Sequence, residues 1–166
     1  LAEQRGFETT REQLFTDNTV MENLLLVGPA GAGLSLDTPV SFASLAGQEL
    51  VLPSARHGLR VILDRCAREV GIPLRTSVEA DSFGAMIDLV RNGFGLTALP
   101  LASIYAQLEN GSLCAAPLVE PVPMRKLVQV FPADRRVSPA ARFVADTFIE
   151  IAADLVERKI WAGHML

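Results

Sequence analysis

Two short polar stretches follow apolar runs in this sequence and are its best candidates for chemistry. Pro53–His57 follows the run ELVL at 49–52, and Asp81–Phe83 follows a strand expected at 74–80. Each stretch also precedes apolar residues at helical spacing, so each is expected where a strand ends and a helix starts. A helix start presents unpaired N–H groups and a partial positive charge. The pattern therefore predicts an anion or carboxylate site to which Ser54, Arg56 and His57 contribute.

A purely structural role fits the same residues. Ser54 can cap the helix that follows while Arg56 is solvated, and Asp81 or Ser82 can cap the next helix. Phe83 fits an apolar core better than a ligand contact. Thr97 and Pro100, near the end of the following strand, are weaker candidates for the site. The residues alone leave both interpretations open.

The sequence contains few residues that could form a phosphate loop, a metal site or a catalytic site. The stretch GPAGAG at 28–33 lacks the Gly-Lys-Ser/Thr ending of a phosphate loop and does not fit GxGxxG, so a surface loop is expected. With only His57 and His164, and no metal spacing around Cys66 and Cys114, we expect no metal, no cofactor and no catalytic residue. Cys66 lies on the apolar side of its helix and is expected as a buried thiol, with a disulfide to Cys114 as the alternative.

Composition narrows the class of protein. The 166 residues suffice for one domain or two small lobes, and 49% hydrophobic with 20% charged residues is normal for a globular protein. The net charge of −4 argues against direct contact with DNA phosphates. The opening residues lack the apolar core of a signal peptide, and no apolar run reaches eighteen residues. We therefore expect a cytoplasmic protein without a membrane span.

Strands and helices must alternate to position the two polar stretches. The helix at 58–70 ends at Gly71 and Pro73, and Ser138-Pro139 is a strong start for the last helix. Pro117, Pro121 and Pro123 indicate an irregular connection, and residues 1–20 are the least readable part. Strands are expected at 23–27, 49–52, 74–80, 95–99 and 126–131. Helices are expected at 58–70, 82–92 and 101–109, and from 139 to about 158 or 160. This alternation predicts an α/β layer with a mainly parallel sheet.

Three stretches, taken in order, resemble a known family. They are LVLPSARHGLR at 50–60, VEADSFGAMIDLVRNGFGLTALP at 78–100, and a segment from 113 to 143 that ends in SPAARF. Each motif is weak alone, but the ordered set is similar to the C-terminal effector-binding domain of LysR-type transcriptional regulators. The likeness is greatest to the subgroup that includes nitrogen-assimilation-control-like members.

The resemblance implies a type 2 periplasmic-binding-protein-like α/β fold with helices on both faces, one lobe complete and the other partial. Residues 1–22 would be a crossing segment or remnant of lobe I, 23–133 lobe II, and 134–166 the C-terminal helix returning to lobe I, and a tail. The effector-binding residues implied are Ser54, Arg56, His57, Asp81, Ser82, Phe83 and Thr97.

The implied function is allosteric. A small-molecule effector, an anionic metabolite being one option, would control DNA binding by a helix-turn-helix domain that is absent from this chain, in a homodimer or homotetramer. Two alternatives remain: a solute-binding protein of the same fold that serves transport, and a small α/β enzyme such as a prephenate-dehydratase-like domain.

Overall fold

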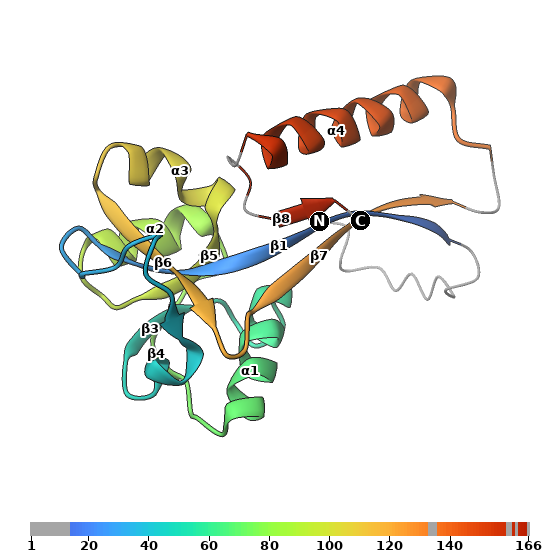
Figure 1. The fold of residues 1–166 in the computed structure, drawn as a ribbon. Coiled ribbons are helices and arrows are strands. Elements are labelled where there is room, and N and C mark those ends of the chain that lie inside the picture. The colour runs from blue at the N-terminus through green and yellow to red at the C-terminus, as the bar shows by residue number, and fades with distance from the viewer. Residues whose placement is uncertain (1–13, 133–135, 159–160, 162, 166) are drawn as a thin grey trace.

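The computed structural model describes residues 14–132, 136–158, 161 and 163–165 of the chain. An α/β body carries an elongated arm, which consists of the first half of β1 together with β7, α4 and β8 (Figure 1). The strands are β1 Leu14–Pro29, β2 Val40–Ser41, β3 Glu49–Leu52, β4 Arg75–Glu79, β5 Thr97–Pro100, β6 Leu113–Val119, β7 Met124–Pro132 and β8 Gly163–Met165. The helices are α1 Gly58–Val70, α2 Phe83–Arg91, α3 Leu101–Glu109 and α4 Pro139–Glu157, and a 3-10 turn spans Phe42–Leu45.

The strands of the body run in one direction with a single exception. β3 pairs in parallel with β4 and is bridged in parallel to β5 through Leu50 and Leu96, and β2 pairs in parallel with β6. β1 lies between β5 and β6 and runs antiparallel to both. The expected type 2 periplasmic-binding-protein-like α/β fold is confirmed, and β1 is the strand that departs from the parallel arrangement.

β1 is much longer than the strand expected at 23–27. Its second half pairs with β5 and β6 in the body, and its first half pairs with β7 and β8 in the arm. The apolar run at 23–27 predicted only the part of β1 that is buried on both faces. Residues 1–13, most of the segment that was hard to read, lie outside the described part of the chain.

The irregular connection expected around Pro117 is partly wrong, because Leu113–Val119 forms β6. Pro117 pairs with Leu25 of β1 on one side, while on the other side β2 begins pairing only at Leu118. Proline is tolerated in a sheet where its missing N–H faces an open edge. Residues 120–123 then separate β6 from β7, and both strands run along β1.

The predicted end of α1 and the predicted start of α4 are confirmed. α1 ends at Gly71 in the left-handed conformation, with φ of 71°, and α4 begins after an Ser138 N-cap with Pro139 in its first turn. The GPAGAG stretch is only partly a loop, because Gly28 and Pro29 still belong to β1. Among the described helices, none combines the length and hydrophobicity that a membrane crossing requires.

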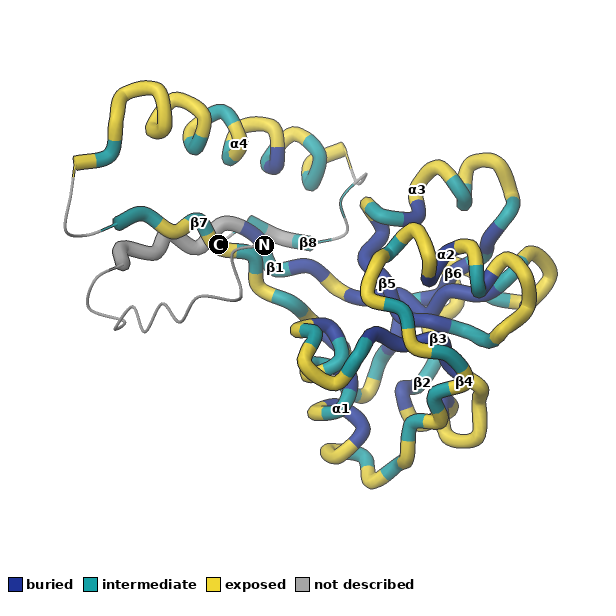
Figure 2. Tube along the Cα trace, turned by 180° about the vertical axis from the view of Figure 1, so that it is seen from behind, coloured by how far each residue is buried: buried dark blue, intermediate teal, exposed yellow. Residues whose placement is uncertain are grey.

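The core belongs to the body. Leu24 and Val27 of β1, Val51 of β3, Leu63 of α1 and Met86 of α2 are buried in one continuous cluster. Figure 2 shows the buried residues concentrated in the body, whereas α4 is mostly exposed. The sheet is therefore mostly buried at β3, β5 and β6, whereas β4 at its edge and the strands of the arm are more open.

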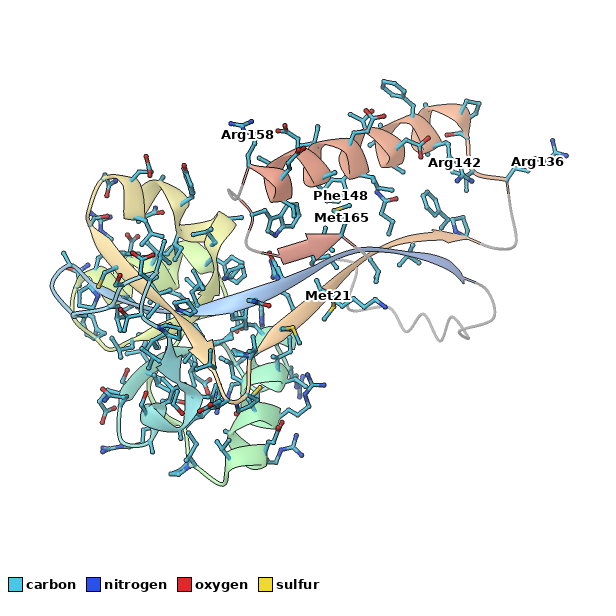
Figure 3. All side chains as sticks on the ribbon, viewed as in Figure 1. Met21, Arg136, Arg142, Phe148, Arg158 and Met165 are labelled. Atoms are coloured by element: carbon cyan, nitrogen blue, oxygen red, sulfur yellow. The ribbon has the colours of Figure 1, made fainter. Side chains whose placement is uncertain are left out.

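The arm packs loosely. Gln129 of β7 donates a hydrogen bond to the Ala145 carbonyl at 2.8 Å, and Arg142 lies over the Phe131 ring (Figure 3). Adjoining hollows of about 460 and 370 Å³ lie between β7 and α4. Several large apolar side chains of the arm are exposed, namely Val128, Val130, Phe143, Val144, Phe148 and Ile151.

Candidate functional site

The two polar stretches lie side by side. They follow β3 and β4, which are parallel neighbours with Leu52 opposite Glu79. The Ser54 N–H donates to Asp81 Oδ1 at 2.8 Å, and the Ser54 hydroxyl donates to Asp81 Oδ2 at 3.1 Å. The two stretches are therefore adjacent, and we call residues 53–57 and 80–83 the turn pair.

Asp81 is a structural link between the turns. Hydrogen bonds from the Ser54 N–H and then from the Ser54 hydroxyl lower the pKa of its carboxyl group, because they stabilise the charged form. Both carboxylate oxygens are thereby engaged. The hydroxyl of Ser54, one of the predicted effector-binding residues, donates to Asp81 in this structure.

The helix caps differ from the expectation at one position. α1 is capped by His57, whose Nδ1 accepts a hydrogen bond from the Leu59 N–H at 3.2 Å, and not by Ser54. Ser82 caps α2 by accepting from the Ala85 N–H at 3.1 Å, as expected for one of the two candidates there. With Nδ1 as acceptor, the neutral imidazole of His57 carries its proton on Nε2, which leaves a donor.

The remaining predicted residues divide into two groups. Arg56 is exposed, and Phe83 is half-buried with its ring centroid 6.5 Å from that of His57, so both lie at or beside the turn pair. Thr97 lies apart, because it is fully buried within β5 opposite Val27. Among the described residues its Oγ1 has no hydrogen-bond partner.

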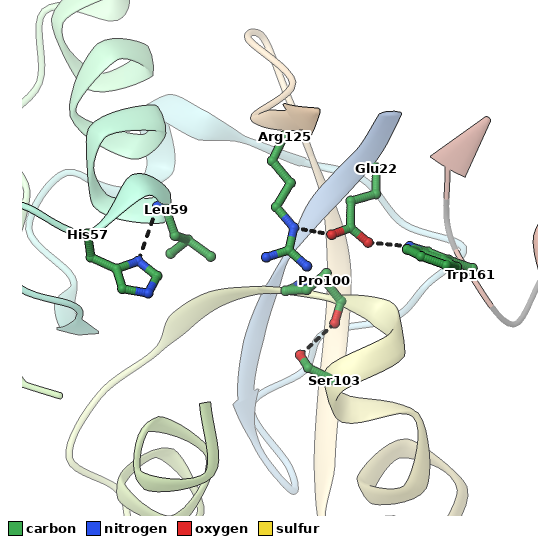
Figure 4. A network of polar contacts seen from close by, with 7 residues as sticks. All are labelled: Glu22, His57, Leu59, Pro100, Ser103, Arg125 and Trp161. Carbon is green, nitrogen blue, oxygen red and sulfur yellow. Dashed lines mark hydrogen bonds and ion pairs between the residues drawn. The ribbon is translucent and has the colours of Figure 1, made fainter. Parts of the chain in front are cut away.

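The start of β5 lies beside β3. The Val51 N–H donates to the Leu96 carbonyl at 2.8 Å, and the Leu96 N–H donates to the Glu49 carbonyl at 2.9 Å. Pro100, where β5 ends, is buried, and its carbonyl accepts a hydrogen bond from Ser103 at 2.8 Å (Figure 4). The starts of α1, α2 and α3 therefore follow three strands that run in the same direction.

Sequence reasoning missed a polar cluster next to the turn pair. Glu22 of β1 is buried, and its carboxylate accepts hydrogen bonds from Arg125 Nε and Trp161 Nε1 (Figure 4). The Arg125 guanidinium lies 5.7 Å from the centroid of the Phe83 ring. The one available signal was an acidic residue just before the apolar run NLLLV, because a buried carboxylate requires a partner.

Metal sites and cysteine thiols are the remaining kinds of chemistry to consider in the described residues. They contain no group of three His, Cys, Asp or Glu side chains that could hold a metal ion. Both cysteines are free, which confirms the thiol prediction for buried Cys66. Burial raises the pKa of the Cys66 thiol, so it does not favour the reactive thiolate.

Sequence comparison gives the family. Residues 5–153 match the model of the LysR substrate binding domain. The chain is 27% identical over 143 residues to a RuBisCO operon transcriptional regulator of Acidithiobacillus ferrooxidans, covering 86% of this chain and 45% of that protein. It is 25% identical over 135 residues to a probable nitrogen assimilation transcriptional activator of Synechococcus elongatus, covering 78% and 44%. The chain thus spans less than half the length of these relatives.

Solved structures support the fold. The CcmR regulatory domain of Synechocystis PCC6803 in complex with 2-PG matches with a TM-score of 0.73 at 15% identity, covering 87% of this chain and 70% of that one. The effector binding domain of QuiR in complex with shikimate matches with a TM-score of 0.69 at 16% identity, covering 89% and 69%.

These findings bear on the interpretations that the sequence left open. The relatives named above are transcriptional regulators, not enzymes or transport proteins, so the transport alternative is not supported. The family model covers most of the chain, including the turn pair and nearly all of α4. This chain therefore belongs to the LysR substrate binding domain family.

Proposed function

We propose that this domain senses a small-molecule effector at the turn pair and thereby controls DNA binding by a longer, cytoplasmic transcriptional regulator. The observation that carries the proposal is the Ser54–Asp81 link, which holds the starts of α1 and α2 together at the ends of parallel strands. Ligands of open α/β sheets bind outside the carboxyl ends of their strands. The 2-PG and shikimate complexes of the fold relatives support the same kind of role.

Individual residues would have separate tasks in this site. Ser54, Asp81 and Ser82 hold the turns in shape through hydrogen bonds, as the contacts above show. Arg56 and the Nε2 of His57 are left as donors toward a ligand, and Phe83 offers an apolar ring. Thr97 is a poor contact because its hydroxyl is buried inside the sheet.

The arm would belong to a second lobe. Its exposed apolar residues, among them Phe143, Val144 and Phe148, form a surface of the kind that further chain covers in a complete domain. The match to only 70% of the CcmR regulatory domain supports this division, with residues 23–133 as lobe II and 134–166 returning to lobe I. β1 and β7 are then the strands that connect the lobes.

The mechanism is a shift of equilibrium. An effector that binds one arrangement of lobes or subunits more tightly favours that arrangement, in a homodimer or homotetramer whose DNA-binding domains lie outside this chain. Because coupling is reciprocal, operator DNA should change effector affinity by the same factor as the effector changes DNA affinity.

The test is a binding screen on the longer regulator. Small carboxylates and amino-acid-related metabolites are screened by thermal shift, and the affinity of each hit is measured by calorimetry. Arg56→Ala and Ser54→Ala should weaken binding, whereas Arg68→Ala, on an exposed position of α1, should not. Unchanged affinity in both turn-pair variants would show that the effector binds elsewhere.

A further inference from the structure

Arg125 lies at the junction between the body and the arm. It lies near the start of β7, where the arm leaves the body, opposite Glu22 of β1. Its side chain is 26% exposed, so the guanidinium is partly desolvated yet accessible. In Figure 4 the guanidinium lies between the Glu22 carboxylate and the His57 ring. Among the described residues, the hydrogen bond to Glu22 engages only its Nε, which leaves the Nη groups as donors.

Glu22 fixes this guanidinium. It is 1% exposed, and its two carboxylate oxygens are divided between Arg125 Nε and Trp161 Nε1. A carboxylate held from two sides orients the guanidinium without engaging its terminal amino groups. Such a supporting contact gives a binding group a fixed geometry before the ligand arrives.

The Arg125 guanidinium lies near the turn pair. Phe83 has the Arg125 guanidinium 5.7 Å from its ring centroid and the His57 ring 6.5 Å from it. Arginine and the Nε2–H of His57 are donors only, and a guanidinium matches the two oxygens of a carboxylate or phosphate. Asp81, the acidic residue of the turn pair, has both carboxylate oxygens engaged by Ser54.

We infer that Arg125, with His57, binds the oxyanion group of a negatively charged effector, and that Glu22 is the positioning residue that aims it. This inference rests on the proposed function and adds to it the charge class of the ligand and a contact on the connecting strand β7. The site then reaches from the turn pair to the junction of body and arm, so an anion bound there contacts a strand that leads into the arm.

Trp161 provides the readout. It is the only tryptophan of the chain and donates to the same carboxylate that holds Arg125. The chain is titrated with malonate, with inorganic phosphate, and with neutral malonamide of similar size, at constant ionic strength, while Trp161 fluorescence is followed. We expect a saturable change with malonate or phosphate and none with malonamide, and malonate against phosphate distinguishes the carboxylate from the phosphate form of the ligand.

Variants of Arg125 test whether this residue binds the anion. Arg125→Gln should weaken malonate or phosphate binding about tenfold or more, since a hydrogen bond to a charged group contributes that much to affinity. Arg125→Lys, which keeps the charge and loses the fork, should give an intermediate loss. Lys126→Gln is the matched control, because the next residue of a strand points to the other face and Lys126 is exposed.

A folding defect is separated from a binding defect by a second variant. Arg125→Gln leaves the Glu22 carboxylate buried beside a neutral group, so the double variant Glu22→Gln/Arg125→Gln, with two neutral amides, is also titrated after circular dichroism shows a cooperative melt. It should show the same loss of anion binding.

Three outcomes of these titrations overturn the inference. They are a wild-type chain that responds to neither anion, equal responses to malonate and malonamide, and undiminished anion binding in the double variant. An effector of the longer regulator whose affinity depends on Arg56 but not on Arg125 would overturn this inference and leave the proposed function intact. Failure to find any effector would contradict both this inference and the proposed function.

Discussion

Replacing Gly95 by alanine tests how closely β3 and β5 must approach. Gly95 has a φ of 141°, and a Cβ added there would lie 2.4 Å from the Glu49 carbonyl oxygen. The same carbonyl accepts the hydrogen bond from the Leu96 N–H that joins β5 to β3. Alanine must therefore push apart the two backbones where the start of β5 lies beside β3.

The expected cost follows from two contributions. An unfavourable backbone conformation costs roughly 1–3 kcal/mol. Separation of the strands weakens the hydrogen bonds of Leu96 to Glu49 and of Val51 to Leu96, at about 0.5–1.5 kcal/mol each. The total is about 4 kcal/mol, which corresponds to a fall in melting temperature of roughly 8–16 °C for a domain of this size.

The control is another glycine with positive φ and open space. Gly93 has a φ of 79°, and nothing lies within 4 Å of an added Cβ. Gly93→Ala should therefore cost only about 1–2 kcal/mol, the penalty of the left-handed conformation. Urea unfolding of the wild type and both variants, followed by circular dichroism, gives the comparison. Equal losses in the two variants would refute the argument that close approach of β3 and β5 dominates at Gly95.

Three further predictions concern the turn pair, the core and the thiol. Because the pKa of Asp81 is lowered in the folded state, its contribution to stability is present above the ordinary aspartate pKa and lost as pH falls below about 4. Melting curves from pH 6 to pH 2 should show a smaller acid loss in Asp81→Asn than in the wild type, and identical acid limbs would contradict this. Leu63→Ala, at a residue 1% exposed, should cost about 3 kcal/mol in urea unfolding, whereas Val61→Ala, at 53% exposure, should change stability by about 0.5 kcal/mol or less. In a Cys114→Ser variant, Cys66 should react with Ellman's reagent only as fast as the protein opens, because burial raises its pKa, and rapid labelling of the native state at pH 8 would count against this.

The sequence predicted only part of the candidate site. Pro53–His57 and Asp81–Phe83 were found because strand, turn and helix signals adjoin within a few residues. Their hydrogen-bond partners were not, since Ser54 could equally have capped α1 and it bonds Asp81 instead. The choice depends on the parallel pairing of β3 with β4, which local signals do not contain.

The sequence by itself determined the order of most elements, the bounds of helices such as 58–70 and 101–109, and the two turns, because periodicity, caps and prolines act over a few residues. Only the tertiary structure decided the length and direction of β1, the strand nature of 113–119 and the joining of Glu22 to Arg125 and Trp161. Glu22 and Arg125 are 103 positions apart and meet through the register of β1 with β7. A slip of one residue would turn Arg125 to the other face of the sheet, and register is set by packing across the whole fold.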